Sequence, residues 1–161
     1  MDHPESPHLW RTWLEANARR FLLFARDQTR CEADAQDVLQ DALVEVWRRS
    51  DGRMPDHALV FATIRRRAID LARRNDRREL REQAAPEWFH APVGEPAHDD
   101  ELERAVKALP PNLREVVVLK VWSELTFQQI ANTLGIPLNT AASRYRYALD
   151  HLRAALKEVR S

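Results

Sequence analysis

The chain has 161 residues, of which 44% are hydrophobic and 31% charged, and its 25 basic and 25 acidic residues cancel to a formal net charge of zero. This length allows one or two small domains, and the single cysteine excludes an internal disulfide or a cysteine-rich zinc site. With no apolar run near the roughly 18 residues of a membrane helix, we expect a protein of the reducing cytoplasm that does not insert into a membrane.

The first predicted helix spans residues 8–28 and carries no pattern typical of a functional site. We expect it to serve packing, through the apolar side chains of Leu9, Trp13, Ala16, Phe21, Leu22 and Phe24. A second helix is predicted over residues 33–49, and its inward arc is formed by Ala35, Leu39, Ala42, Leu43 and Val46.

The outward face of this second helix carries an acidic stripe. Its four members follow one another at helical spacing: Asp34, Asp37, Asp41 and Glu45. No Lys or Arg lies at i+4 within the stripe, and like charges at this spacing cost a few tenths of a kcal/mol per pair. The stripe is either a solvated face or a docking site for a basic partner surface.

After a break over residues 50–57, a long third helix is predicted over 58–81, with Phe61, Ile64, Ala68, Leu71 and Ala72 inward. Its other side is dense in arginine. Residues 65–81 hold eight arginines against three acids, whereas residues 31–47 hold five acids and no base. Such segregation predicts two different partner surfaces, and the arginine face favours nucleic-acid contact over simple solvation.

Residues 84–98 are predicted to be a linker, because they hold three prolines and scattered acids. A short helix over 99–109 follows and is closed by two consecutive prolines. The next helix is predicted over residues 112–122, with Leu113, Val116, Val117 and Val121 facing inward.

The most informative stretch is residues 125–156, which predict a short helix, a tight turn and a longer helix. Thr126 is a candidate N-cap, and Gly135 tolerates the left-handed backbone of a helix end. We expect the longer helix to be capped by Asn139 or Thr140. The short helix has one apolar face, formed by Phe127, Ile130, Ala131 and Leu134.

The longer helix has two unlike faces at about 100° per residue. The apolar arc holds Ala141, Tyr145, Ala148, Leu149 and Leu152. The opposite arc holds hydrogen-bonding and basic side chains, with Arg146 at its flank: Thr140, Ser143, Arg144, Tyr147 and His151. Two helices joined by a tight turn fit a helix-turn-helix, whose second helix lies in the DNA major groove. The alternative is an ordinary helical hairpin in a bundle.

Two parts of the chain resemble one family. Residues 34–49, DAQDVLQDALVEVWRR, and residues 61–79, FATIRRRAIDLARRNDRRE, resemble region 2 of bacterial sigma factors. Residues 108–156 resemble region 4, and the order and short linker are similar to the extracytoplasmic-function (ECF) group of the sigma-70 family. The resemblance implies an all-α fold of two small helical domains, a three-helix bundle over 1–83 and a four-helix helix-turn-helix domain over 99–161.

What the family does follows from the same resemblance. Sigma factors bind core RNA polymerase and direct it to specific promoters, so the implied partners are core RNA polymerase and promoter DNA. Membership of the ECF group implies a stress- or signal-responsive regulon. Many members are held inactive by an anti-sigma factor, which makes such a protein a further candidate partner.

The resemblance also assigns site residues by position. Core-polymerase binding falls on Asp34, Asp37, Gln40 and Asp41. Recognition of the −10 element falls on the Ser50–His57 loop and on Arg66, Arg73, Arg74 and Asn75. Recognition of the −35 element falls on Asn139, Thr140, Ser143, Arg144, Arg146 and Tyr147. The chain has Ala142 where the family often has Lys and Tyr147 where Arg is common, so two phosphate contacts are expected to be missing.

Two hypotheses of other classes compete with this one. A stand-alone helix-turn-helix regulator would have no use for the acidic stripe. An enzyme acting on nucleic acid by metal-dependent chemistry would need clustered carboxylates, whereas the acids here follow one helical stripe. His57, His90 and His98 show no metal-ligand spacing, and no glycine-rich phosphate loop is present. We therefore expect no enzymatic activity, no metal and no cofactor.

Overall fold

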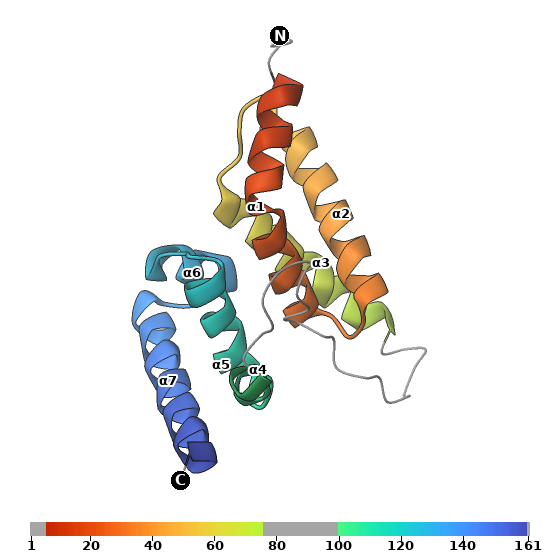
Figure 1. Ribbon diagram of the computed structural model, residues 1–161. Helices are drawn as coiled ribbons and strands as arrows, with labels where there is room; N and C mark the ends of the chain where they lie inside the picture. Colours follow the sequence, from red (N-terminus) through yellow and green to blue (C-terminus); the bar gives the residue numbers. More distant parts are fainter. Residues whose placement is uncertain (1–5, 76–99, 161) are drawn as a thin grey trace. The chain divides into compact units, whose positions relative to one another are not determined.

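The chain folds into two helical units. The structure is a computed structural model that describes residues 6–75 and 100–160, and these residues form helices and short connections without a strand. The two compact units are Met1–Pro86 and Glu87–Ser161 (Figure 1). This confirms the all-α prediction with two small helical domains. The predicted linker over 84–98 lies outside the described residues, so the boundaries at 83 and 99 stay predictions.

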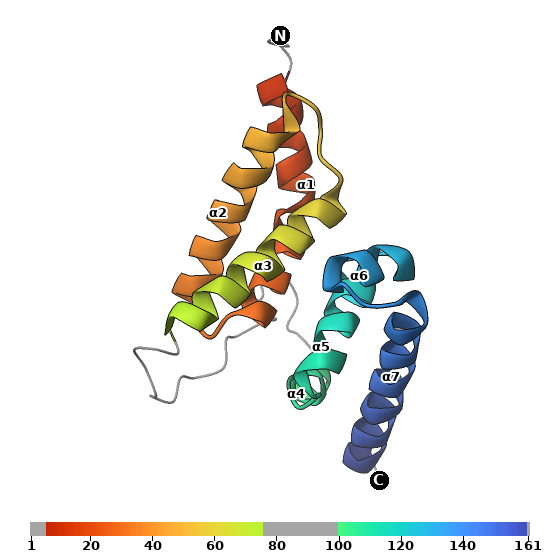
Figure 2. The same ribbon diagram turned by 180° about the vertical axis from the view of Figure 1, so that it is seen from behind.

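Unit 1 is a three-helix bundle of α1 (Ser6–Gln28), α2 (Glu32–Ser50) and α3 (His57–Asn75). Each helix packs against the other two, and α3 crosses α1 and α2 (Figure 2). The largest fully buried side chains in this core are Phe21, Phe24, Val46, Val60, Phe61 and Ile64. The Phe61 ring lies edge-on to two others, with centroids 5.1 Å from Phe21 and 5.6 Å from Phe24. Such aromatic pairs stabilise the core beyond their buried area.

The start of α1 packs differently from the sequence prediction. Leu9 was expected to make apolar contacts, and this is wrong because its side chain is 49% exposed. Trp10 makes the contact instead, with its ring centroid 4.5 Å from that of Trp47 on α2. Just after Trp47, α2 is terminated by Asp51 and Gly52, whose φ angles of 52° and 83° are the left-handed geometry that ends a helix.

Unit 2 comprises α4 (Asp100–Lys107), α5 (Pro111–Val117), a π-helical turn η1 (Val118–Trp122), α6 (Phe127–Leu134) and α7 (Leu138–Arg160). The long helix α7 packs against α4, α5 and α6. The core between them is made of fully buried apolar side chains, among them Val106, Val116, Val117, Leu119, Leu125 and Ile130.

The helix predicted over 112–122 is interrupted by the π-helical turn. The Ser123 N–H donates to the Val118 carbonyl at 3.0 Å, an i to i+5 bond that widens the turn. A wider turn changes which residues face the core. Leu119 is therefore fully buried, whereas Val121, predicted to face inward, is 46% exposed.

The short helix of the helix-turn-helix has the predicted ends. The Thr126 hydroxyl accepts a hydrogen bond from the Gln129 N–H at 3.1 Å, and the Gln129 side chain accepts one from the Thr126 N–H at 2.8 Å. This reciprocal pair is a capping box and confirms Thr126 as the N-cap. Gly135, at φ 66°, ends α6 in the left-handed conformation.

The start of α7 differs from the prediction that Asn139 or Thr140 caps it. The helix begins at Leu138, and the Ala141 N–H donates to the Pro137 carbonyl at 3.1 Å. Proline suits this position because its fixed φ is compatible with a helix start and its missing N–H would have had no helical partner. Both residues predicted as caps thus lie inside the first turn, where their side chains are not used for capping.

Candidate nucleic-acid interface

One face of α7 lines an open concavity of about 380 Å³, which α5 closes on one side. The structure brings together five of the six residues assigned to −35 recognition: Asn139, Thr140, Ser143, Arg144 and Tyr147. The sixth, Arg146, is exposed and lies outside the concavity, with its guanidinium carbon 5.5 Å from the centroid of the Tyr147 ring. Two residues of α5 complete the lining, Asn112 and Leu113.

The polar side chains of this concavity have unused hydrogen-bonding capacity. Among the described residues, Asn139, Thr140, Ser143 and Arg144 have no side-chain hydrogen bond or ion pair. These side chains are exposed or half-buried, so water satisfies them in the free protein and a polar ligand can take the place of that water. A concave surface with free amide, hydroxyl and guanidinium groups is therefore suited to a polar ligand, including base edges and phosphates.

Neighbouring aromatic contacts hold α7 in place. The Phe127 ring on α6 lies 5.5 Å from the Tyr145 ring on α7, and the Lys120 ammonium lies 4.5 Å above the Phe127 ring. Ala141 and Ala148 are fully buried beneath the helix. The face with the free polar groups is thus presented on a rigid element, as a helix that enters a groove requires.

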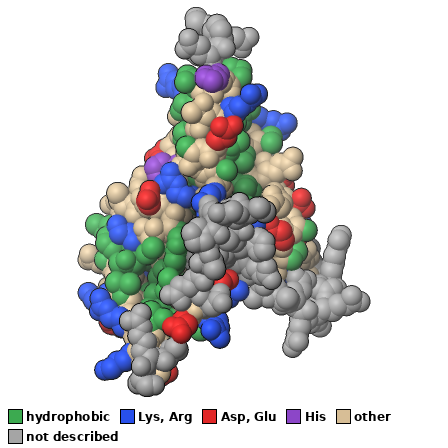
Figure 3. Space-filling view, in the orientation of Figure 1, with side chains coloured by type: hydrophobic (Ala, Val, Ile, Leu, Met, Phe, Trp, Pro, Cys, Tyr) green, Lys and Arg blue, Asp and Glu red, His purple; other side chains and the backbone are tan. Residues whose placement is uncertain are grey.

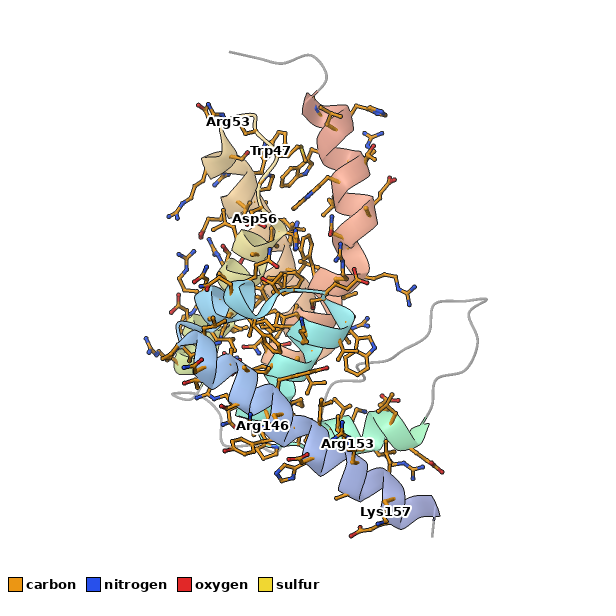
Figure 4. The ribbon with its side chains drawn as sticks, turned by 90° about the vertical axis from the view of Figure 1, so that its left-hand side faces the viewer. Trp47, Arg53, Asp56, Arg146, Arg153 and Lys157 are labelled. Atoms are coloured by element: carbon orange, nitrogen blue, oxygen red, sulfur yellow. The ribbon has the colours of Figure 1, made fainter. Side chains whose placement is uncertain are left out.

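Basic side chains continue along the exposed side of α7. Figure 4 shows Arg146, Arg153 and Lys157 spaced along this helix, and the space-filling view shows Lys and Arg side chains around its outer edge (Figure 3). Arg153 forms an ion pair with Asp150 at 3.7 Å. The positive charge along the helix is therefore partly compensated toward its C-terminal half.

The acidic stripe of α2 lies at the surface of unit 1. Asp37, Gln40 and Asp41 are exposed and Asp34 is half-buried, so the four residues assigned to core-polymerase binding share an accessible face. The fourth acid of the stripe, Glu45, differs from them because its side chain is only 16% exposed.

Glu45 is paired with two arginines of α3. Arg67 donates to one carboxylate oxygen at 2.7 Å, Arg66 donates to the other, and Arg67 also lies 3.8 Å from Asp41. Arg49 of α2, four residues after Glu45, also lies 3.9 Å from the Glu45 carboxylate. The stripe is thus neutralised at its C-terminal end, and two of the three arginines come from a different helix. Partial burial would raise the pKa of Glu45, but the hydrogen bonds from Arg67 and Arg66 outweigh it and hold this pKa below its ordinary value.

The residues assigned to −10 recognition adjoin the acidic stripe. Arg66, Arg73 and Arg74 are exposed on α3, and Asn75 is half-buried at its end. Arg74 lines a cavity of about 270 Å³ that Asp37 and Asp41 line from α2. The two partner surfaces predicted for unit 1 therefore share an edge, with acidic and basic side chains facing one another.

The loop assigned to −10 recognition follows α2. Its Arg53, Met54 and Asp56 are exposed, and the neighbouring Trp47 is 38% exposed (Figure 4). An exposed aromatic ring beside a basic side chain is a combination that suits unstacked bases.

Residues 6–75 and 100–160 contain neither a cluster of metal-ligating side chains nor a membrane-spanning helix. No group of three or more His, Cys, Asp or Glu side chains there is arranged to hold a metal ion. None of the helices in these two ranges is long and apolar enough to cross a bilayer.

Two features of the site escaped the sequence analysis. Asn112 lines the concavity of α7, yet nothing in the sequence near it indicates a contact with residues 139–147. The two consecutive prolines before it signal only where α5 begins. The pairing of Glu45 with Arg66 and Arg67 was missed because the partners come from a different helix.

Comparison with known proteins identifies both units. The family model described as Sigma-70 region 2 matches residues 13–78, and the one described as Sigma-70, region 4, matches residues 99–152. The chain is 31% identical over 134 residues to the ECF RNA polymerase sigma factor RpoE of Cereibacter sphaeroides, covering 75% of this chain and 71% of that protein. It is 33% identical over 129 residues to the RNA polymerase sigma-E factor of Streptomyces avermitilis, covering 77% and 72%.

Solved structures share the fold. The sigma factor RpoE of Bartonella quintana, solved in complex with the anti-sigma factor NepR, matches with a TM-score of 0.74 at 21% identity, covering 92% of this chain and 96% of that one. CnrH, solved in complex with the cytosolic domain of CnrY, matches with a TM-score of 0.65 at 22% identity, covering 94% and 90%. On the sequence matches of both units, the chain belongs to the ECF group of the sigma-70 family of RNA polymerase sigma factors.

Proposed function

We propose that the chain is a promoter-specificity subunit that binds core RNA polymerase in the cytoplasm and reads the −35 element with α7. The single observation that carries the −35 assignment is the concavity on α7. It gathers five predicted DNA-contact residues, and four of them have no other hydrogen-bond partner among the described residues. Because these groups make no hydrogen bond or ion pair with the described residues, they are available to base edges and phosphates without breaking any such bond of the fold.

In this proposal Arg144 and Arg146 have different roles. Arg144 is half-buried and lines the concavity between α5 and α7. A guanidinium on the face of the helix that enters the groove suits a bidentate contact with guanine, which contributes roughly 1–3 kcal/mol of discrimination. Arg146 is exposed at the flank and free to follow a phosphate, so it contributes affinity without sequence preference.

Unit 1 supplies the polymerase contact and the −10 contact in the proposal. Asp34, Asp37, Gln40 and Asp41 form the accessible acidic face of α2 that would meet a basic surface of core polymerase. The loop after α2 and the exposed arginines of α3 would meet the −10 element. Because these surfaces share an edge, one bound polymerase can present the melted promoter strand directly to α3.

We further propose an inhibitory protein partner of the anti-sigma type. The sigma factor RpoE of Bartonella quintana, which has the same fold, was solved with the anti-sigma factor NepR. A partner that covers the acidic face of α2 would exclude core polymerase by competition. Core polymerase should therefore displace it in a concentration-dependent manner.

The −35 assignment is tested by run-off transcription from a promoter library randomised over the −35 element, with holoenzyme reconstituted from core polymerase and the full chain. Arg144→Ala should lower transcription and change which bases are preferred. Arg146→Ala, the matched control on the same helix, should lower yield without changing preference. Ala142→Lys should raise yield by adding a phosphate contact and should steepen the salt dependence by about one unit. Unchanged yield and preference for Arg144→Ala would contradict −35 recognition by α7.

A second measurement separates this function from that of a stand-alone regulator. The pairing of α3 arginines with Glu45 and the zero net charge predict weak duplex binding by the free chain. A gel shift should therefore show promoter binding only when core polymerase is present. Tight, sequence-specific binding by the chain alone would favour the stand-alone regulator.

A further inference from the structure

We propose that Asn112 of α5 is an additional promoter contact whose carboxamide donates a hydrogen bond to a phosphate beside the major groove entered by α7. This inference rests on the proposed −35 recognition by α7. It extends that site to a second helix, one that carries none of the residues assigned to DNA contact.

The position of Asn112 supports the proposal. Its side chain is exposed and lines the same concavity as Asn139, Ser143 and Arg144. Like them, it has no hydrogen-bond partner among the described residues. A ligand that occupies the concavity against α7 therefore meets a free carboxamide from α5.

The backbone that carries Asn112 is fixed before DNA arrives. The N–H groups of Leu113 and Arg114 donate to the Pro110 carbonyl at 3.0 Å and 2.9 Å, and the Leu113 side chain is 7% exposed in the core. Asn112 lies on the segment between these anchors, so only its own side-chain torsions remain to be ordered. Contacts from a preorganised backbone lose less entropy on binding than contacts from a loop.

The choice of phosphate over base follows from which helix supplies the residue. The second helix of a helix-turn-helix occupies the groove and reaches base edges, while flanking elements meet the sugar-phosphate walls. Asn112 comes from the flanking helix α5, which lines the concavity opposite α7 with only Asn112 and Leu113. A neutral carboxamide there adds affinity for every sequence and releases no counterion of its own.

The test uses holoenzyme, made from core polymerase and the full chain, on duplex promoter fragments randomised over the −35 element. Asn112→Ala should weaken binding roughly three- to tenfold on all −35 sequences alike, the net loss expected for one hydrogen bond to a phosphate that stays open to water. Its salt slope should equal that of the wild type, because no charge is lost. Asn112→Lys should bind more tightly at about 50 mM salt and steepen the slope by about 0.9.

Asn132 provides the matched control, because it is exposed on α6 and does not line the concavity. Asn132→Ala and Asn132→Lys should bind as the wild type does, and circular dichroism should show all variants folded. A change of base preference in Asn112→Ala would overturn the phosphate assignment in favour of a base contact. If both Asn112 variants match the wild type while Arg144→Ala is impaired, Asn112 does not touch DNA. If Arg144→Ala is also unimpaired, the proposed −35 function itself is wrong.

Discussion

Replacing Glu45 by Gln tests the ion-pair cluster that links α2 to α3. The substitution keeps the shape of the side chain and removes the charge that Arg66 and Arg67 share. It also leaves Arg67 with few partners, because its Nε is already buried without a hydrogen bond. Unit 1 should therefore become less stable, while unit 2 is unaffected.

The size of the effect follows from the exposure of the partners. Hydrogen bonds between charged groups contribute roughly 1.5–3 kcal/mol each when sheltered. The Arg66 and Arg67 side chains are 50% and 36% exposed, so water screens much of this energy. Since Gln keeps one acceptor oxygen, we expect unit 1 to lose about 1–2 kcal/mol of its free energy of unfolding. This loss corresponds to a roughly five- to thirtyfold larger population of the opened state, in which the amides of unit 1 exchange.

The effect should depend on pH in a defined direction. The folded-state pKa of Glu45 lies below its ordinary value of 4.5, so the unfolded chain takes up the proton first as the pH falls. The stabilisation by Glu45 is therefore fully present above pH 4.5 and is lost as the pH falls through the folded-state pKa. Wild type and Glu45→Gln should converge in acid.

Hydrogen exchange read by mass spectrometry measures each unit separately. Peptides from α2 and α3 should exchange about five- to thirtyfold faster in Glu45→Gln at neutral pH, and peptides from α7 should be unchanged. Asp37→Asn is the control, because Asp37 is exposed and has no ion-pair partner among the described residues. The stability of unit 1 in this variant should stay within about 0.5 kcal/mol of the wild type. Equal exchange in wild type and Glu45→Gln at neutral pH, or a difference that persists in acid, would refute the reasoning.

Two further predictions concern the acidic stripe of α2 and the turn between α6 and α7. Asp37→Arg combined with Asp41→Arg should abolish co-purification with core polymerase while the fold is kept. Gln36→Arg, which lies outside the stripe on the same helix, should leave co-purification unchanged. Normal capture of core polymerase by the folded double variant would exclude the stripe as the docking face. Gly135→Ala should destabilise unit 2 by about 1–2 kcal/mol, measured by hydrogen exchange in α7. The cost comes from the backbone, because φ is 66° and nothing lies within 4 Å of the added methyl group. Gly135→Asn should lose less stability, and an Ala variant as stable as the wild type would show that the turn relaxes.

Local patterns in the sequence determined the helices and their faces. The i, i+3, i+4 spacing placed Ile130, Ala131 and Leu134 in the core, where they are at most 6% exposed. Thr126 and Gly135 were recognised as the ends of α6 because capping and left-handed geometry depend on one or two residues. The face of α7 that holds Ser143, Arg144 and Tyr147 could be predicted as well, since helical periodicity alone puts them together.

The contacts between different helices were determined only by the tertiary structure. Helical periodicity does not identify the side chain of another helix that lies opposite a given residue. The Glu45 contacts to Arg66 and Arg67, at sequence separations of 21 and 22, therefore could not be predicted. Asn112 joins the α7 concavity only because α5 packs against α7. Val121 faces outward because packing of the segment after α5 favours a π turn, which shifts the helical phase that the sequence pattern assumes.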